Sequence, residues 1–261
     1  MEIIIKDVNC NKCDFTCSIN NKDIVGITGK NKEVLLDILT LNKELEGIYI
    51  NNEEINKDNI NKYRKKISVV KKDIKEELFL NTVEDNMKYI MKNKRLSIKD
   101  ESKKMSDSLR IVGLNKTYLS REINTLSKAE LRLIGISISL LSNPDIILLD
   151  EPFIDLDNKN DKKLYRMLSK LKEQYKKTII ICSNDSNILY KYTNKMVFLK
   201  DNEVLIEGET DNIYQDVDFL LENKIEIPDI VLFTYKARKK GIKLSYHKDV
   251  RDIIKDIYKY V

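Results

Sequence analysis

Residues 142–157, SNPDIILLDEPFIDLD, are the most informative stretch of the sequence. Its apolar run, 146–149, ends in two adjacent carboxylates, Asp150 and Glu151, followed by a proline. An unbroken apolar run is typical of a strand buried on both faces of a parallel sheet, whose C-terminal end faces the ligand crevice. Acidic residues often end strands, but the flanking residues favour a site. There Asp150 would hold magnesium through water and Glu151 would polarise an attacking water.

The rest of the chain has the pattern of an α/β protein. Residues 178–182 form a second unbroken apolar run, and an amphipathic helix over 162–174 would connect the two strands. The chain is expected to break at residues 26–29, before a helix containing residues 34–39, and to turn in a hairpin at Asp201-Asn202. Other strands are predicted at 3–5, 24–27, 48–50, 67–70, 196–199 and 204–206, with mostly helical structure over 76–142 and from 211 onward.

Composition narrows the class of protein. The 261 residues fit one large domain, or one domain with an appendage. With 42% hydrophobic and 34% charged residues and a mean hydropathy of −0.41, the chain is neither membrane-embedded nor wholly disordered. The net charge of +5 is scattered, which indicates a solvated surface and no nucleic-acid partner. No apolar run reaches the ~18 residues that span a bilayer, and the N-terminus lacks a signal peptide, so we expect a cytosolic product.

Three of the four cysteines are clustered. Cys10, Cys13 and Cys17 read C-x2-C-x3-C, a spacing that could hold a metal. A closed zinc site needs about four ligands, and the single histidine, His247, lies far away in sequence. The favoured interpretation is three free thiols in a reduced compartment, lining a short hairpin.

The motifs, in their order, resemble the ATP-binding-cassette (ABC) ATPases. Residues 142–157 resemble that family's Walker B strand and D-loop. The resemblance implies an α/β, P-loop NTPase-like core over residues 1–209, with a mixed sheet, flanking helices and a helical subdomain at about 73–142. The other matching segments are 26–39 in the P-loop position, 67–86 around the Q-loop, 126–133 (LSKAELRL) at the LSGGQ signature, and 178–208 covering the switch-histidine loop and a closing hairpin.

The C-terminal part of the sequence resembles one particular group of ABC ATPases. Residues 227–242, IPDIVLFTYKARKKGI, place Pro228 and Gly241 to start and stop a helix. This segment is similar to the C-terminal extension of the energy-coupling factor (ECF) transporter ATPases, which power vitamin and metal-ion importers in bacteria. By that resemblance, residues 210–261 form a small helical extension.

The phosphate-binding segment departs from the family pattern. In G-x4-G-K-[ST], backbone amides surround the phosphates, the lysine reaches the β- and γ-phosphates, and the hydroxyl binds magnesium. Read from Gly29, the sequence is GKNKEVLL, about three residues shorter than that pattern. Lys32 falls at the lysine position and Glu33 at the hydroxyl position, where its charge would repel phosphate. We expect Gly29, Lys30, Asn31, Lys32 and Glu33 to form a weakened nucleotide-binding loop. Lys30 and Lys32 would either attract an anion or be ordinary surface lysines.

Other expected nucleotide contacts are altered as well. Lys72 stands at the Q-loop glutamine position. Asn184, in SND, stands at the switch-histidine position and cannot carry a proton at neutral pH. After the signature serine, Ser127, the two glycines are replaced by Lys128 and Ala129. In the family those glycines let a partner's backbone approach the γ-phosphate.

Only the carboxylate pair and the D-loop, 154–157, keep the family residues. No aromatic residue lies in 9–14, where the family stacks the adenine. Phe15 and Tyr49 are nearby, but the sequence assigns the base to neither.

The resemblance also implies cofactors and partners. ATP and Mg²⁺ are expected if the site is functional, with Asp150 as the metal ligand. Because each ATP of an ABC dimer lies between one subunit's P-loop and the other's signature, a second ABC ATPase subunit is expected, in a homodimer or heterodimer. The other partner would be a transmembrane T-component, contacted by residues 76–87, which places the chain on the cytoplasmic face of the cell membrane.

Three interpretations follow. The favoured one is a degenerate ABC subunit of an ECF-type importer with little or no ATPase activity. In the second, Lys30, Lys32 and Lys72 compensate for the short loop, and the chain is a competent transporter ATPase. In the third, it is a cytosolic scaffold or regulator that reuses the fold without a transport role.

Overall fold

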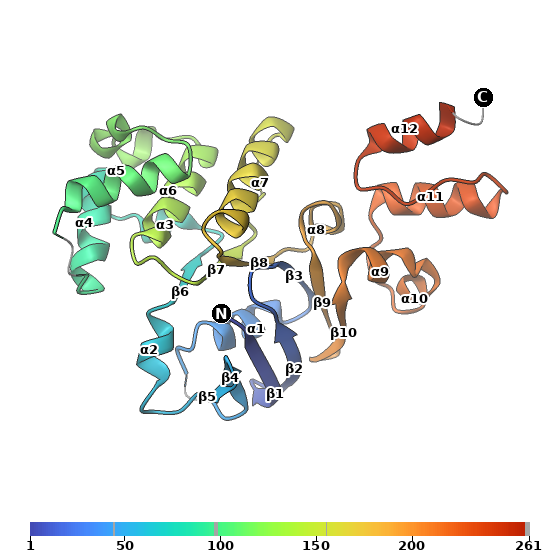
Figure 1. The fold of residues 1–261 in the computed structure, drawn as a ribbon, viewed down its shortest axis with the longest axis horizontal. Coiled ribbons are helices and arrows are strands. Elements are labelled where there is room, and N and C mark those ends of the chain that lie inside the picture. The colour runs from blue at the N-terminus through green and yellow to red at the C-terminus, as the bar shows by residue number, and fades with distance from the viewer. Residues whose placement is uncertain (44, 97–98, 155, 259–261) are drawn as a thin grey trace.

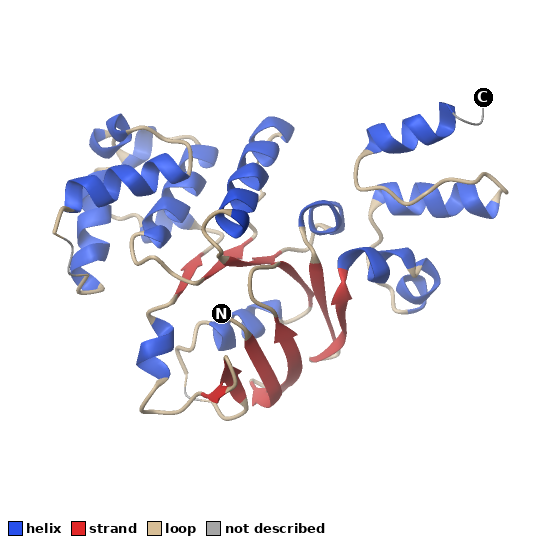
Figure 2. Ribbon diagram, viewed as in Figure 1, coloured by secondary structure: helices blue, strands red, loops and turns tan. Residues whose placement is uncertain are grey.

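The computed structural model describes residues 1–43, 45–96, 99–154 and 156–258. Its strands form one sheet in the order β5-β4-β1-β2-β10-β9-β3-β8-β7-β6 (Figures 1 and 2). The strands are β1 (Ile3–Cys10), β2 (Cys13–Ile19), β3 (Ile24–Gly29), β4 (Ile48–Ile50), β5 (Glu53–Glu54), β6 (Ile67–Val70), β7 (Ile146–Asp150), β8 (Thr178–Cys182), β9 (Lys195–Lys200) and β10 (Glu203–Glu209).

Many of the helices lie in two groups on opposite sides of the molecule. In Figure 1, α4 to α6 lie together beyond β6, while α9 to α12 lie on the opposite side, beyond β10. The helices are α1 (Lys32–Leu39), α2 (Ile60–Arg64), α3 (Ile74–Glu77), α4 (Val83–Asn93), α5 (Glu101–Ile111), α6 (Lys128–Leu140), α7 (Asn158–Glu173), α8 (Ser186–Tyr192), α9 (Thr210–Gln215), α10 (Val217–Glu222), α11 (Asp229–Lys239) and α12 (Val250–Tyr258), with 3-10 turns η1 (Lys116–Ser120) and η2 (Ile123–Thr125).

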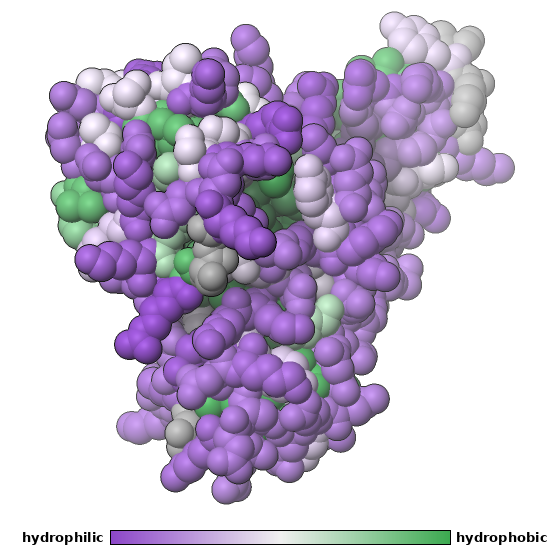
Figure 3. Space-filling model, turned by 60° about the vertical axis from the view of Figure 1, so that its left-hand side comes forward, coloured by the Kyte–Doolittle hydropathy of each residue, from purple (hydrophilic) through white to green (hydrophobic). Residues whose placement is uncertain are grey.

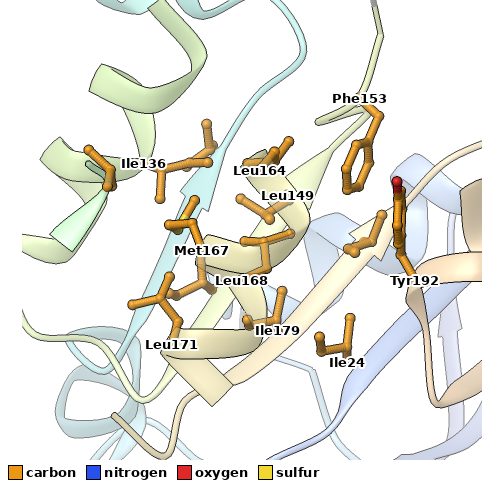
Figure 4. Close-up of a cluster of buried hydrophobic side chains, with 14 of the residues drawn as sticks. Ile24, Ile136, Leu149, Phe153, Leu164, Met167, Leu168, Leu171, Ile179 and Tyr192 are labelled. Atoms are coloured by element: carbon orange, nitrogen blue, oxygen red, sulfur yellow. The ribbon is translucent and has the colours of Figure 1, made fainter. Parts of the chain in front are cut away.

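The centre of the sheet is parallel and buried on both faces. Strands β3, β8, β7 and β6 run parallel, as the unbroken apolar runs of β7 and β8 predict for those two strands. Alternate residues point to opposite faces: Leu148 and Ile180 join the cluster that includes α1, and Leu149 and Ile179 join the one that includes α6 and α7. Figure 4 shows the second cluster. A strand sandwiched in this way cannot slip in register without exposing its apolar side chains.

Side chains at the helix starts set where several helices begin. The side chains of Thr82, Ser127, Asp157 and Asp185 accept hydrogen bonds from backbone N–H groups in the first turns of α4, α6, α7 and α8. The Asp157 cap places the start of α7 at Asn158, so the prediction of a helix from residue 162 was wrong by one turn.

Two further expectations need correction. The chain does not break at Gly26, which lies inside β3; a Cβ there would meet Met196 Sδ at 2.4 Å, so a larger residue would crowd the side chains of α8 and β9. Strand β1 continues past residue 5 to Cys10 and pairs on both sides, with β2 and β4. The missed half of β1 alternates buried and exposed residues, a weaker signal than an unbroken apolar run.

The three N-terminal cysteines lie on the β1–β2 hairpin, as predicted. Cys10 pairs with Cys13 across the turn, and all of them are buried with free thiols. Burial, and to a lesser degree Glu207, raises the pKa of Cys17 to about 12. This thiol is therefore protonated at neutral pH and unreactive.

The surface is largely polar. Figure 3 shows one face of the molecule covered mostly by hydrophilic residues. Among the described residues, no helix combines the length and apolarity needed to cross a membrane.

The double-sided core predicts a large effect for truncating a central strand residue. Ile180 is fully buried, so Ile180→Ala is expected to lower the free energy of unfolding by about 2–5 kcal/mol. The matched change Ile254→Ala, on exposed α12, is expected to stay within about 0.5 kcal/mol. Urea unfolding followed by circular dichroism measures both, and equal losses would contradict the assignment of β8 to the core.

Candidate functional site

The loop after β3 is tightly held, but it is not shortened. Counted from Gly26, residues 26–33 have the eight positions of G-x4-G-K-[ST], with Asn31 at the second glycine and Glu33 at the hydroxyl position, so the expectation of about three missing residues was wrong. Gly29 has φ +108°, and a Cβ there would lie 2.0 Å from the carbonyl oxygen of Leu199, so only glycine fits. Only Lys30 and Asn31 lie between this glycine and α1. Asn31 is left-handed (φ 63°), and its side-chain amide donates to Asn202 in the β9–β10 turn. The loop is therefore anchored to the neighbouring strand and its hairpin turn.

Lys32 is buried at the start of α1 and points across the site. Its Nζ lies 2.9 Å from Asn184 Oδ1, 3.3 Å from Glu33 Oε1 and 3.7 Å from Glu151 Oε1. With only 5% of the residue exposed, Lys32 is not the surface lysine that one interpretation of the sequence allowed. Lys30 is exposed. Asn184, Glu33 and Glu151 therefore already supply hydrogen-bonding and charge partners for the Lys32 ammonium.

Glu151 is fixed by the end of the neighbouring strand. Asp150 and Cys182 are paired in register, so β7 and β8 end side by side. The Glu151 N–H donates to the Cys182 carbonyl (2.8 Å), and its carboxylate accepts from the Ser183 hydroxyl (2.7 Å) and the Asn184 N–H (3.0 Å). Glu151 itself has φ 43°, a left-handed backbone conformation that is uncommon for a residue with a side chain. The pairing register of β7 and β8 therefore brings Glu151 together with Ser183 and Asn184, which lie more than thirty positions further along the chain.

Asp150 is partly desolvated beside this group. Burial raises the pKa of its carboxyl, and the charges of Glu151 and Glu33 push in the same direction. The backbone N–H of Lys72 and the ammonium of Lys32 oppose that shift. The Asp150 carboxylate is therefore short of positive partners.

The Q-loop and signature positions meet at a separate cavity. Lys72 and Lys128 both line a space of about 410 Å³ between the strand ends and α6. Arg132 also lines it and donates from Nη1 to the Lys71 carbonyl (3.1 Å). Lys72 and Lys128 are exposed, and Ala129 is half-buried.

Ser127 has a structural role in this chain. Its hydroxyl and N–H form a reciprocal capping box with Glu130 at the start of α6. A hydrogen bond from Tyr118 is the main cause that lowers the pKa of Glu130 to about 2, so this carboxylate stays charged and keeps the cap.

The two aromatic residues near the expected adenine position do not offer a free ring face. Phe15 is fully buried in the core and cannot stack on a base, and Tyr49 is half-buried beneath Lys6. Asp155, in the D-loop segment, lies outside the described residues.

Ser183 was missed by the sequence analysis, although it directly precedes Asn184 in the SND tripeptide.

The cluster of Lys32, Glu33, Asp150 and Glu151 carries one positive and three negative charges. These residues come from α1 and the end of β7, and together with Asn184 they occupy the C-terminal edge of the parallel strands. In the described ranges, no three Asp, Glu, Cys or His side chains converge well enough to hold a metal ion. The Lys32 ammonium can bind a ligand at this edge of the sheet only if its contacts with Asn184 and Glu151 are broken.

Comparison with known proteins gives the family. A model of the ABC transporter family matches residues 13–154, more than half of the chain. The energy-coupling factor transporter ATP-binding protein EcfA2 of Staphylococcus aureus is 30% identical over 224 residues, which are 83% of this chain and 78% of the relative. EcfA2 of Mycoplasma mobile is 30% identical over 202 residues, 77% of this chain, and the match spans only 65% of that relative.

Solved structures agree on the fold. The dimeric ATP-binding cassette MJ0796, in a post-hydrolysis state bound to ADP and Pi, superposes with a TM-score of 0.68 at 25% identity, covering 80% of this chain and 99% of that one. CbiO1 of Clostridium perfringens, part of the ABC transporter complex cbiONQ, gives a TM-score of 0.74 at 20% identity, covering 89% and 98%. The predicted fold class, an α/β ABC ATPase core with a mixed sheet, is thus confirmed, and the chain belongs to the ABC transporter family.

Proposed function

We propose that this chain is an ABC subunit of an ECF-type membrane importer, and that its own site binds nucleotide weakly and hydrolyses it slowly or not at all. The relatives named as ECF transporter ATP-binding proteins support the transporter role. The geometry of the loop after β3 supports weak nucleotide binding. ATP and Mg²⁺ are the cofactors that the family implies, and the question is whether the residues present fit them.

The observation that carries the proposal is the engagement of Lys32 within the chain itself. Its ammonium must leave Asn184 and Glu151 before it can reach a phosphate. Glu33 also stands where the pattern has the hydroxyl that binds magnesium, and its carboxylate repels phosphate. Each charge-assisted hydrogen bond is worth roughly 1.5–3 kcal/mol, so losing two weakens binding on the order of a hundredfold or more. The loop as it stands does not fit a triphosphate, and we assign no catalytic step to it.

The remaining positions agree with a weak site. We place Asp150 at the metal-ligand position, Glu151 at the general-base position and Asn184 at the switch-histidine position. Glu151 is held by Ser183 and Asn184, and Asn184 supplies no titratable group. At the signature, Lys128 and Ala129 carry side chains where close backbone approach is needed.

The partners that we propose are a second ABC ATPase subunit and a transmembrane T-component, on the cytoplasmic face of the membrane. Residues 1–209 would form the nucleotide-binding domain, with its helical subdomain at about 73–142, and residues 210–261 the C-terminal extension. The transported substrate would be set by another subunit.

An exposed aromatic pair marks the surface that we assign to the T-component. Phe79, just after α3, is 61% exposed and meets Tyr89 of α4 edge-on, with ring centroids 4.8 Å apart. The turn between them is rigid, because Asn86 bonds to both the N–H and the carbonyl of Leu80. Large apolar side chains held on a fixed exposed turn are suited to a protein interface.

The first prediction concerns ATP. The purified chain is expected to bind MgATP at least about a hundredfold more weakly than an intact ABC site and to release phosphate at the rate of its Glu151→Gln variant. Isothermal titration and phosphate release measure these quantities. Rapid hydrolysis that Glu151→Gln abolishes would identify a competent ATPase and refute the proposal.

A repaired loop provides the matched gain-of-function test. Asn31→Gly together with Glu33→Ser restores G-x4-G-K-S, counted from Gly26. This variant is expected to gain nucleotide affinity, because it regains the glycine and the hydroxyl of the pattern and loses a repelling carboxylate. The same double substitution with Lys32→Met is the control and should gain little.

A second prediction concerns the desolvated carboxyl of Asp150. Its raised pKa means that the folded state disfavours the charged form, so this destabilisation is absent below the ordinary value of 3.8 and develops as the pH rises through the raised value. Asp150→Asn is therefore expected to raise the free energy of unfolding at pH 7 and to change it little near pH 3.5. Urea titrations at both pH values, in a chelator, measure this. A larger gain in acid would contradict the assigned cause.

A third prediction concerns the exposed aromatic pair. Phe79→Ala is expected to reduce co-purification with a co-expressed T-component at least about fivefold, since a central aromatic anchor at an interface contributes 1 kcal/mol or more. Its urea midpoint should stay unchanged. Leu221→Ala on α10, a residue that is 52% exposed, is the control. Unaltered assembly of Phe79→Ala would remove this surface from the interface, and failure of the unmodified chain to recover any T-component would favour a role outside transport.

A further inference from the structure

A second cavity lies at the opposite edge of the parallel sheet. It has a volume of about 320 Å³ and lies between α5, the C-terminal ends of α6 and α7, and the segments that lead into β7 and β8. Lys177 directly precedes β8, and Asn143 lies in the turn before β7. Since Asp150 and Ser183 are at the other ends of these strands, the cavity is separate from the loop after β3.

Two lysines, Lys104 and Lys177, line the cavity. Lys177 is only 7% exposed, and its Nζ donates to Asn143 Oδ1 (2.8 Å). Lys104, on the facing side of α5, lines the same space. Within the described ranges of the chain, neither lysine makes an ion pair. Burial is the main cause that lowers the pKa of Lys177, and the charge of Lys104 adds to it.

The nearby carboxylates are already engaged. Asp107, which also lines the cavity, is paired with Arg110 (Nη2–Oδ1 2.9 Å). Asp145, which favours the charged form of Lys177, is paired with Lys66 (Nζ–Oδ2 3.4 Å). An exposed lysine needs no partner, because water solvates it, but a buried ammonium beside a second one is costly. An anion between the two would relieve both desolvation and repulsion.

We propose that this cavity binds a small phosphomonoester. The phosphate would lie between Lys104 and Lys177, with the Asn143 amide as a further donor. The organic part would contact Tyr175 and the apolar wall. That wall consists of side chains from three helices, namely Ile111, Leu140 and Leu171. The volume is at the lower end of the range for small-molecule sites, which limits the ligand to a compact molecule.

The test uses inorganic phosphate and phenyl phosphate as probes, titrated calorimetrically into the full chain. Both are expected to bind, phenyl phosphate more tightly. Lys104→Met and Lys177→Met are each expected to weaken binding at least tenfold. Lys103→Met, the neighbouring and exposed lysine of α5, is the matched control and should bind normally. Tyr175→Ala should remove the advantage of phenyl phosphate over phosphate.

A further variant separates this cavity from the loop after β3. Lys32→Met is expected to leave phosphate binding unchanged, whatever the outcome of the ATP measurements. Circular dichroism checks that each variant is folded, and Lys104→Met, which is only half-buried, keeps the test valid if Lys177→Met is unstable. Normal binding by Lys104→Met, loss of binding in Lys32→Met, or no binding at millimolar phosphate would each overturn the proposal.

Discussion

The common ending of β7 and β8 is the constraint on which the site depends. These strands are buried on both faces, so their register is set by the core and cannot adjust to the ligand edge. As a consequence, Glu151 and Asn184 meet at that edge, and both reach Lys32 from α1. The same register places Asn143 and Lys177 together at the far edge. One core therefore creates both of the sites discussed above.

Much of this fold could be predicted because its signals are local. The apolar runs at β7 and β8, the Asp201-Asn202 turn and the Pro228–Gly241 helix each follow from neighbouring residues. The errors lie where distant contacts override the local pattern. Gly26 resembles a chain break, yet it lies inside β3, where a Cβ would crowd the side chains of α8 and β9. Likewise, the start of α7 was set by the Asp157 cap and not by the apolar period.

The candidate site was predictable in its members but not in its contacts. Asp150, Glu151, Asn184 and Lys32 were found by position in a family pattern. The sequence could not give the contact between Lys32 and Asn184, which joins residues 152 positions apart. Ser183 was missed for a similar reason: its hydroxyl becomes relevant only once β8 ends beside Glu151. Side-chain direction at a strand end depends on tertiary packing, which the local pattern does not encode.

The internal contacts of Lys32 give a physical reason why an ABC fold can persist with an altered phosphate-binding loop. A buried ammonium left without partners would destabilise the chain, since desolvation of an unpaired charge costs several kcal/mol. Here Asn184 and Glu151 provide partners without any nucleotide. Asn184 does so as a neutral acceptor; a protonated histidine there would repel the lysine. Asn184 and the altered loop therefore support one another: the loop brings Lys32 to the strand ends, and the asparagine accepts its hydrogen bond there. Stability of the fold is in this way separated from occupation of the site, and selection on the two can act independently.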